Sequence, residues 1–190
     1  MNFTFVLGSV RPNRVGIRAA KFICAQVEKR GHKATLVDPL EYPLPLLDMR
    51  LSDYEPGKAP ELLQKLSKIF AESDAIIAVT AEYNHTLPPA LSNLMDYFRA
   101  EYQFKPGAAV SYSGGPFGGV RATLHLENFF SELGMPVVAN LPIPAIQNVL
   151  DESGKATDPK MDERAGKFLE KVEWWASALS EARKKGVPKQ

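Results

Sequence analysis

The chain begins with a strand, a polar loop and a helix, and this unit strongly limits the folds that the rest can adopt. Residues Asn2–Leu7 (NFTFVL) are rich in aromatic and β-branched side chains, which is typical of a buried strand. Apolar residues then recur at helical spacing over Ile17–Arg30. A strand that leads directly into a helix is the building unit of α/β folds, in which helices cover a largely parallel sheet.

The loop Gly8–Gly16 (GSVRPNRVG) joins this strand to the helix and favours the binding of a phosphate group. Free backbone N–H groups and the positive end of the helix dipole attract anions to a helix N-terminus. Ser9 can donate a hydrogen bond, and Arg11 or Arg14 can supply positive charge and a planar set of donors. The alternative is a plain turn whose arginines are only solvated.

Strand and helix signals alternate along the chain, which predicts a parallel sheet with helices on both faces. Strands are expected at Asn2–Leu7, Lys33–Asp38, Ala75–Thr80, Ala108–Tyr112 and Pro136–Asn140. Helices are expected at Ile17–Arg30, Pro60–Glu72, Pro89–Phe98, Gly119–Leu133 and Pro159–Arg183. Five strands fit a flavodoxin-like, doubly wound α/β fold with order 2-1-3-4-5 and a ligand crevice between the first and third strands.

Size and composition exclude several classes of function. The 190 residues suit one domain, expected to span residues 1–190. With 23 basic and 22 acidic residues the net charge is only +1, which argues against nucleic acid as a main partner. The absence of a signal-peptide pattern and of a long apolar run predicts a cytoplasmic protein without a membrane partner. Cys24 is the only cysteine, so we expect a buried, inert thiol and no metal site.

Two further loops should meet the first one, because the loops after the first, third and fourth strands share one edge of such a sheet. In Ala81–Pro89, Asn84 tolerates unusual backbone angles, and Tyr83 or His85 could stack on a flat heterocycle or bond to it. The alternative for the histidine is an ordinary loop position. In Ser113–Gly119, four glycines in seven positions would let the backbone approach a ligand ring, the alternative being a flexible turn.

One phosphate cradle and two ring-contacting loops predict a mononucleotide site. FMN fits better than a dinucleotide, because the first strand is not followed by the pattern GxGxxG. The segment Pro39–Pro60 is unusually long and contains five prolines and the apolar cluster Leu44–Leu47. A long ordered loop of this kind covers a site, makes a contact or caps the edge of the sheet.

The three loops GSVRPNRVG, AEYNHTLPPALSNLMDYF and YSGGPFGGVRA resemble those of the NADPH-dependent FMN reductases, a flavodoxin-like family that includes quinone, azo-dye and chromate reductases. The resemblance runs from the first strand to about Asn140. It implies that the FMN phosphate is held by Ser9, Arg11, Arg14, Val15 and Gly16. It also implies contacts to the flavin ring from Glu82, Tyr83, Asn84 and His85 on one side and from Ser113, Gly114 and Gly115 on the other.

The chain departs from the family pattern at three places. The family often has serine at the position of Arg14, so charge would replace a hydroxyl in holding the phosphate. It often has proline at the position of Ala81, which would leave the second loop slightly looser. Pro116 and Phe117 replace smaller residues, so the phenyl ring would narrow the substrate space above the flavin.

The resemblance implies an FMN-dependent oxidoreductase that takes hydride from NAD(P)H and reduces a small acceptor such as a quinone or a free flavin. We expect a ping-pong mechanism, no acid or base from the protein, and a homodimer or homotetramer that uses Pro89–Phe98 and Leu44–Leu47 as contacts. A flavodoxin-type electron carrier or flavin-binding sensor is the main alternative, although the arginines and the net charge of +1 are unlike flavodoxins. A second alternative is a Rossmann dehydrogenase in which Asp38 would contact a ribose, but this chain lacks the glycine pattern that such enzymes carry after the first strand.

Overall fold

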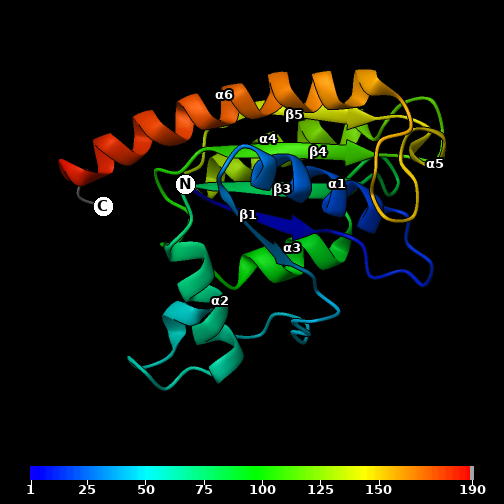
Figure 1. Ribbon diagram of the computed structural model, residues 1–190. Helices are drawn as coiled ribbons and strands as arrows, with labels where there is room; N and C mark the ends of the chain where they lie inside the picture. The colour runs from blue at the N-terminus through cyan, green and yellow to red at the C-terminus, as the bar shows by residue number, and fades with distance from the viewer. Residues whose placement is uncertain (189–190) are drawn as a thin grey trace.

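A computed structural model describes residues 1–188 and contains one sheet of five parallel strands in the order β2-β1-β3-β4-β5 (Figure 1). The order predicted from the sequence is therefore confirmed. The strands are β1 (Asn2–Leu7), β2 (Lys33–Val37), β3 (Ala75–Ala81), β4 (Gly107–Tyr112) and β5 (Val137–Ile143).

Helices cover both faces of this sheet, and each face has its own apolar core. One face carries α1 (Gly16–Lys29) and α6 (Pro159–Lys184), which also pack against each other. The other face carries α2 (Glu61–Ala71), α3 (Pro89–Asp96) and α4 (Val120–Glu132). Two short elements complete the fold, η1 (Leu51–Asp53) and α5 (Ile146–Val149). No helix within residues 1–188 is long and apolar enough to cross a membrane.

The element boundaries differ from the predicted ones mainly at β5 and α3. Strand β5 was expected to end at Asn140, but its ladder with β4 continues to Ile143. Helix α3 ends at Asp96 rather than Phe98. The carbonyl of Tyr97 accepts a hydrogen bond of 2.9 Å from the backbone of Leu51, so the chain there pairs with the long loop instead of extending the helix. Short elements such as α5 have too few residues to give a periodic signal.

The segment between Pro39 and Pro60 lies against α3, the helix that follows the second predicted site loop. The side chain of Asn93 accepts from the backbone of Leu47 at 2.9 Å and donates to the carbonyl of Pro45 at 2.8 Å. The segment is therefore ordered by contacts with α3, while the side chain of Leu46 in its apolar cluster remains 85% exposed.

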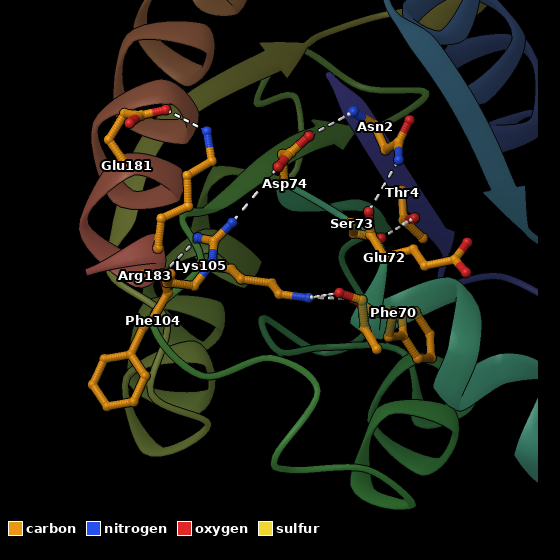
Figure 2. A network of polar contacts seen from close by, with 12 residues as sticks. Asn2, Thr4, Phe70, Glu72, Ser73, Asp74, Phe104, Lys105, Glu181 and Arg183 are labelled. Atoms are coloured by element: carbon orange, nitrogen blue, oxygen red, sulfur yellow. Dashed lines mark hydrogen bonds and ion pairs between the residues drawn. The ribbon is translucent and has the colours of Figure 1, made fainter. Parts of the chain in front are cut away.

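A network of polar groups closes the amino edge of the sheet, at the opposite end from the predicted site (Figure 2). The backbone N–H of Asn2 donates to Asp74 at 2.8 Å, which joins the start of β1 to the start of β3. The hydroxyls of Thr4 and Ser73 lie 2.5 Å apart in a buried position. These bonds satisfy polar groups that the apolar layers on either side cannot pair.

Lys105 is the most deeply buried cation of this network, with 6% of its surface exposed. Its amine donates to the carbonyls of Phe70 and Ala71 at 2.5 and 2.7 Å, at the C-terminal end of α2, where carbonyls lack helical partners. Burial, helped by the charge of Arg183, lowers the pKa of Lys105 from 10.5 to about 8, although Asp74 and Glu101 act in the opposite direction.

This shifted pKa predicts that stability depends on pH through Lys105. Between pH 8 and 10.5 the unfolded chain carries a proton on this amine that the folded protein has released, so stability should rise with pH across that window. Relative to Lys105→Met, the wild type should gain about 2–3 kcal/mol of unfolding free energy between about pH 7.5 and 10.5. Urea unfolding at several pH values measures this difference, with the exposed Lys184→Met as the control. A difference that stays constant with pH would contradict the prediction.

Candidate functional site

The three predicted loops meet at the carboxyl edge of the sheet, to the right in Figure 1. Hydrogen bonds join the first loop to β3 and to the loop that follows it. The backbone N–H of Gly8 donates to the carbonyl of Val79 at 2.9 Å. The hydroxyl of Ser9, which is 3% exposed, lies 2.9 Å from the phenolic hydroxyl of Tyr83. Ser9 is thus fixed by a partner from the second loop.

The start of α1 has the features of an anion site. The helix follows Val15, which provides no side-chain cap, and its first turn contains no acidic residue. The backbone N–H groups of Gly16 and Ile17 therefore lack a side-chain cap, whereas that of Arg18 donates to the carbonyl of Val15 at 3.0 Å. Beside it lies a cavity of about 230 Å³ whose walls include the first loop and two tyrosines; it is lined by Ser9, Arg11, Pro12, Asn13, Arg14, Val15, Ala81, Tyr83 and Tyr112.

The two arginines of the first loop have different surroundings. The guanidinium of Arg11 is exposed and lies 5.9 Å from the centre of the Tyr83 ring, with no ion pair among the described residues. Arg14 instead forms a two-point ion pair with Asp38 and donates to the carbonyl of Ser9 at 2.6 Å. Asp38 thus neutralises the charge of Arg14, and with the carbonyl of Ser9 it occupies three of the five N–H donors of the guanidinium. Arg14 still lines the cavity, and a direct contact between it and a phosphate stays a prediction.

Tyr112, which the sequence analysis treated only as the end of a strand, fixes the position of α1. A methyl group on Gly16 would overlap its hydroxyl and ring, so the helix starts close to β4 only because this residue is glycine. Burial raises the pKa of Tyr112, and the neighbouring Tyr83 adds to the rise. The hydroxyl therefore stays protonated at neutral pH and remains available as a donor beside the helix N-terminus.

The second loop turns back on itself through two residues. The backbone groups of Tyr83 and Thr86 exchange hydrogen bonds of 3.0 and 2.9 Å. Asn84 and His85 between them have φ angles of 50° and 64°, as in the tight turn of a β-hairpin, so the unusual backbone angles expected at Asn84 are present. Both residues are exposed at the tip, and the Tyr83 side chain points back to the first loop.

Glu82 links the second loop to the start of α4 through Arg121, another residue without a predicted role. Its carboxylate accepts hydrogen bonds of 3.0 Å from both the backbone and the guanidinium of Arg121. Burial alone would raise the pKa of Glu82, but the bonds and charge of Arg121 lower it overall. Because the carboxylate is directed to the start of α4, only the backbone of Glu82 remains free to border a ligand.

The third loop is held by the hydroxyl of Ser113 and by two glycines in the left-handed backbone conformation. The Ser113 hydroxyl donates to the carbonyl of Gly115 and accepts from the backbone of Gly118. Gly118 and Gly119 have φ angles of 64° and 75°, where glycine is favoured. By contrast, a methyl group at Gly115 would meet open space, and one at Gly114 would meet only the side chain of Gln147, at an ordinary contact distance of 3.7 Å. The chain itself does not require glycine at these two positions, which suits the close approach of a ligand.

One residue outside the three loops supports the third loop. Gln147 of α5 donates to the carbonyl of Gly114 at 3.1 Å, a role that nothing in the local sequence indicates.

Cys24 packs against the core on α1, and burial, followed by the charge of Glu28, raises its pKa to about 12, so the thiol remains protonated. Within residues 1–188 no group of His, Cys, Asp and Glu side chains could hold a metal ion.

The contact between Gly16 and Tyr112 predicts a specific cost for a small substitution. Gly16→Ala should lower the unfolding free energy by about 1–3 kcal/mol, because a methyl group must displace the tyrosine. Gly166→Ala, in the middle of α6 where a methyl group meets open space, should instead raise it by about 0.5–1 kcal/mol. Urea unfolding measures both variants. Similar effects at the two positions would show that the tyrosine contact is not limiting.

Comparison with known proteins identifies the family. Residues 1–147 match the family model of the NADPH-dependent FMN reductases. A quinone reductase from Pseudomonas putida is 32% identical over 114 residues, and the match covers 56% of this chain but only 61% of that protein. An NAD(P)H-dependent FMN reductase from Saccharomyces cerevisiae is 27% identical over 159 residues, with 75% and 80% of the two chains covered.

Solved structures share the fold. A flavoenzyme NAD(P)H:(acceptor) oxidoreductase from Paracoccus denitrificans superposes with a TM-score of 0.74 at 23% identity, over 91% of this chain and 97% of that one. A flavodoxin variant from Pseudomonas aeruginosa gives a TM-score of 0.54 at 18% identity, over 95% and 99% of the two chains. Since the family model spans 147 of the 190 residues, the chain belongs to the NADPH-dependent FMN reductase family.

Proposed function

We propose that this chain is a single flavodoxin-like FMN-binding domain and an FMN-dependent NAD(P)H oxidoreductase whose acceptor is a small molecule such as a quinone or free flavin. The uncapped start of α1 beside Ser9 and Arg11, at the carboxyl edge of the sheet, carries the proposal. An anion and a flat ring fit this edge together, because the second and third loops border the same region. The names of the Pseudomonas and yeast relatives support the same activity.

The first loop would hold the FMN phosphate. The hydroxyl of Ser9, the unpaired guanidinium of Arg11 and the backbone N–H groups from Val15 to Gly16 are donors suited to a dianion. Hydrogen bonds to charged groups contribute about 1.5–3 kcal/mol each, so a few such donors suffice to retain the cofactor. Arg14 would contribute indirectly, because its guanidinium holds the carbonyl of Ser9.

The other two loops would border the flavin ring through their backbones. The turn from Glu82 to His85 presents N–H and C=O groups on one side, since the Glu82 carboxylate is occupied by Arg121. Ser113, Gly114 and Gly115 lie on the other side, where the two glycines leave room for a close approach. Bound FMN would supply the hydride chemistry, and the protein would supply position and a fixed electrostatic environment.

Phe117 would shape the space that substrates enter. Its side chain is 60% exposed on the third loop and lies 4.8 Å from the guanidinium of Arg121, measured to the ring centre. A nicotinamide stacked on the flavin and a quinone would need the same narrow space. We therefore propose that NAD(P)H and the acceptor bind in turn.

Flavin loading and turnover together test the proposed function. The purified protein should retain FMN with absorbance typical of a flavin, and it should oxidise NAD(P)H in the steady state when a quinone is present. Retention of FMN without NAD(P)H oxidation would indicate an electron carrier or sensor instead. Absence of FMN binding would reject the site as a whole.

The phosphate cradle predicts that Arg11 distinguishes FMN from riboflavin. Arg11→Ala should weaken FMN binding about tenfold or more, because it removes a charge-assisted hydrogen bond to the phosphate. Riboflavin lacks the phosphate, so its affinity should hardly change. Quenching of flavin fluorescence measures both affinities. Arg99→Ala, at an exposed arginine paired with Glu132, makes the same change in net charge and should leave both unaffected; equal losses for the two flavins in Arg11→Ala would exclude a phosphate contact.

If NAD(P)H and the acceptor occupy the same space in turn, the steady-state kinetics should follow a ping-pong pattern. Double-reciprocal plots against NAD(P)H at several quinone concentrations should be parallel, as for a ping-pong reaction. Phe117→Ala should change the preference among acceptors more than the affinity for FMN, because the ring faces the substrate space. Leu124→Ala, at a similarly exposed apolar side chain of α4, is the matched control. Intersecting plots would demonstrate a ternary complex and contradict the proposal.

We also propose a homodimer or homotetramer, for which α3 and the exposed Leu46 are the candidate contacts. The cytoplasmic location stays a prediction from the sequence.

A further inference from the structure

A buried ion pair connects the first loop to the end of β2. Nη1 of Arg14 lies 2.7 Å from Oδ1 of Asp38, and Nη2 binds the second carboxylate oxygen. The two side chains are only 12% and 4% exposed. A planar guanidinium that meets both oxygens of a carboxylate is fixed in orientation as well as in charge.

The same guanidinium also determines the path of the first loop. Nη1 of Arg14 donates to the carbonyl of Ser9 at 2.6 Å, which holds the peptide that follows the serine. On the other side of the pair, Oδ1 of Asp38 accepts from the backbone N–H of Leu40 at 3.0 Å. Asp38 is therefore anchored to its own turn, and through Arg14 it fixes the backbone that carries the Ser9 hydroxyl.

Of the two arginines in the first loop, only Arg11 has a charge that is not neutralised by a carboxylate among the described residues. Asp38 neutralises Arg14 inside the fold, and breaking such a pair would leave an uncompensated buried charge. Arg11 has no carboxylate partner among residues 1–188 and lies at the cavity mouth over Tyr83. Positive charge toward the cavity thus comes from Arg11 and the start of α1.

We infer that Arg14 and Asp38 are positioning residues for the phosphate of FMN, and that neither of them binds it. Their pair would hold the Ser9 peptide and the start of α1 in the geometry that receives the phosphate, which lowers the ordering cost of binding. This inference rests on the proposed function of the loop. It means that Asp38, which follows β2, affects the affinity for the cofactor through its contact with Arg14.

The direction in which Asp38→Asn changes the affinity for FMN shows whether Arg14 positions the loop or binds the phosphate directly. If Arg14 bound the phosphate, removal of the opposing carboxylate would release its charge and strengthen FMN binding. A positioning pair predicts the reverse. Asp38→Asn should weaken FMN about fivefold or more, since it removes one charge-assisted contact that orients the guanidinium, and should leave riboflavin nearly unchanged.

Arg14→Lys provides a second variant that keeps the charge but loses the two-point geometry. It should weaken FMN in the same way, whereas a residue that acted only by its charge would tolerate lysine. A double variant, Arg14→Met with Asp38→Leu, should bind FMN better than Arg14→Met alone, because the single variant leaves a buried carboxylate without a partner. Glu132→Gln, at the exposed pair with Arg99, is the matched control.

Titration of the apoprotein with FMN and with riboflavin, followed by flavin fluorescence, measures these effects together with a thermal melt of each variant. A lower ratio of FMN to riboflavin affinity in Asp38→Asn and Arg14→Lys supports the inference. A ratio equal to or above that of the wild type in Asp38→Asn overturns it while the proposed function stands. If the wild type itself does not prefer FMN over riboflavin, the proposed phosphate site is rejected, and the inference is rejected with it.

Discussion

The central strand β3 imposes the main constraint on this molecule. All residues from Ala75 to Ala81 are buried, and the strand is paired on both sides, with β1 and with β4. An interior of this kind can hold few polar side chains, because each would need a partner in the core. Polar groups therefore collect at the two ends of the sheet. The amino end uses them to close the fold around Asp74 and Lys105, and the carboxyl end uses them to build the candidate site.

At the carboxyl end, ion pairs join loops that are far apart in the sequence. Asp38 after β2 holds Arg14 of the first loop, and Glu82 after β3 holds Arg121 beside the third loop. In both cases the acid follows one strand and the base lies close to the start of a helix, Arg14 just before α1 and Arg121 in the first turn of α4. Both pairs order the loops before any ligand arrives, so less conformational entropy is lost on binding. Arg11 lies outside both pairs, over the ring of Tyr83 and among the residues that line the cavity.

The sequence was sufficient to predict the strand order and the meeting of the three loops, because both follow from alternating hydrophobic patterns and parallel topology. The directions of the polar side chains were not predictable. Whether Arg14 turns to a phosphate or to Asp38 depends on the depth at which that carboxylate is buried, and only packing determines it. The same holds for Tyr112, whose contact with Gly16 joins two elements that local patterns treat separately. Local sequence patterns thus predict where the site lies, whereas tertiary contacts determine the direction and the partner of each polar side chain in it.

In the proposed site, the third loop would separate the cofactor from the substrate side. Its backbone is fixed by Ser113, Gly118 and Gly119, whose close contacts and left-handed angles allow little substitution. The exposed ring of Phe117 lies under the guanidinium of Arg121, and a cation–π contact at an exposed position contributes only about 0.5–1 kcal/mol. In the proposed function, a change at this ring would alter the space open to an acceptor, while the backbone proposed to face the cofactor would keep its shape. Acceptor preference would then vary independently of cofactor binding within one rigid framework.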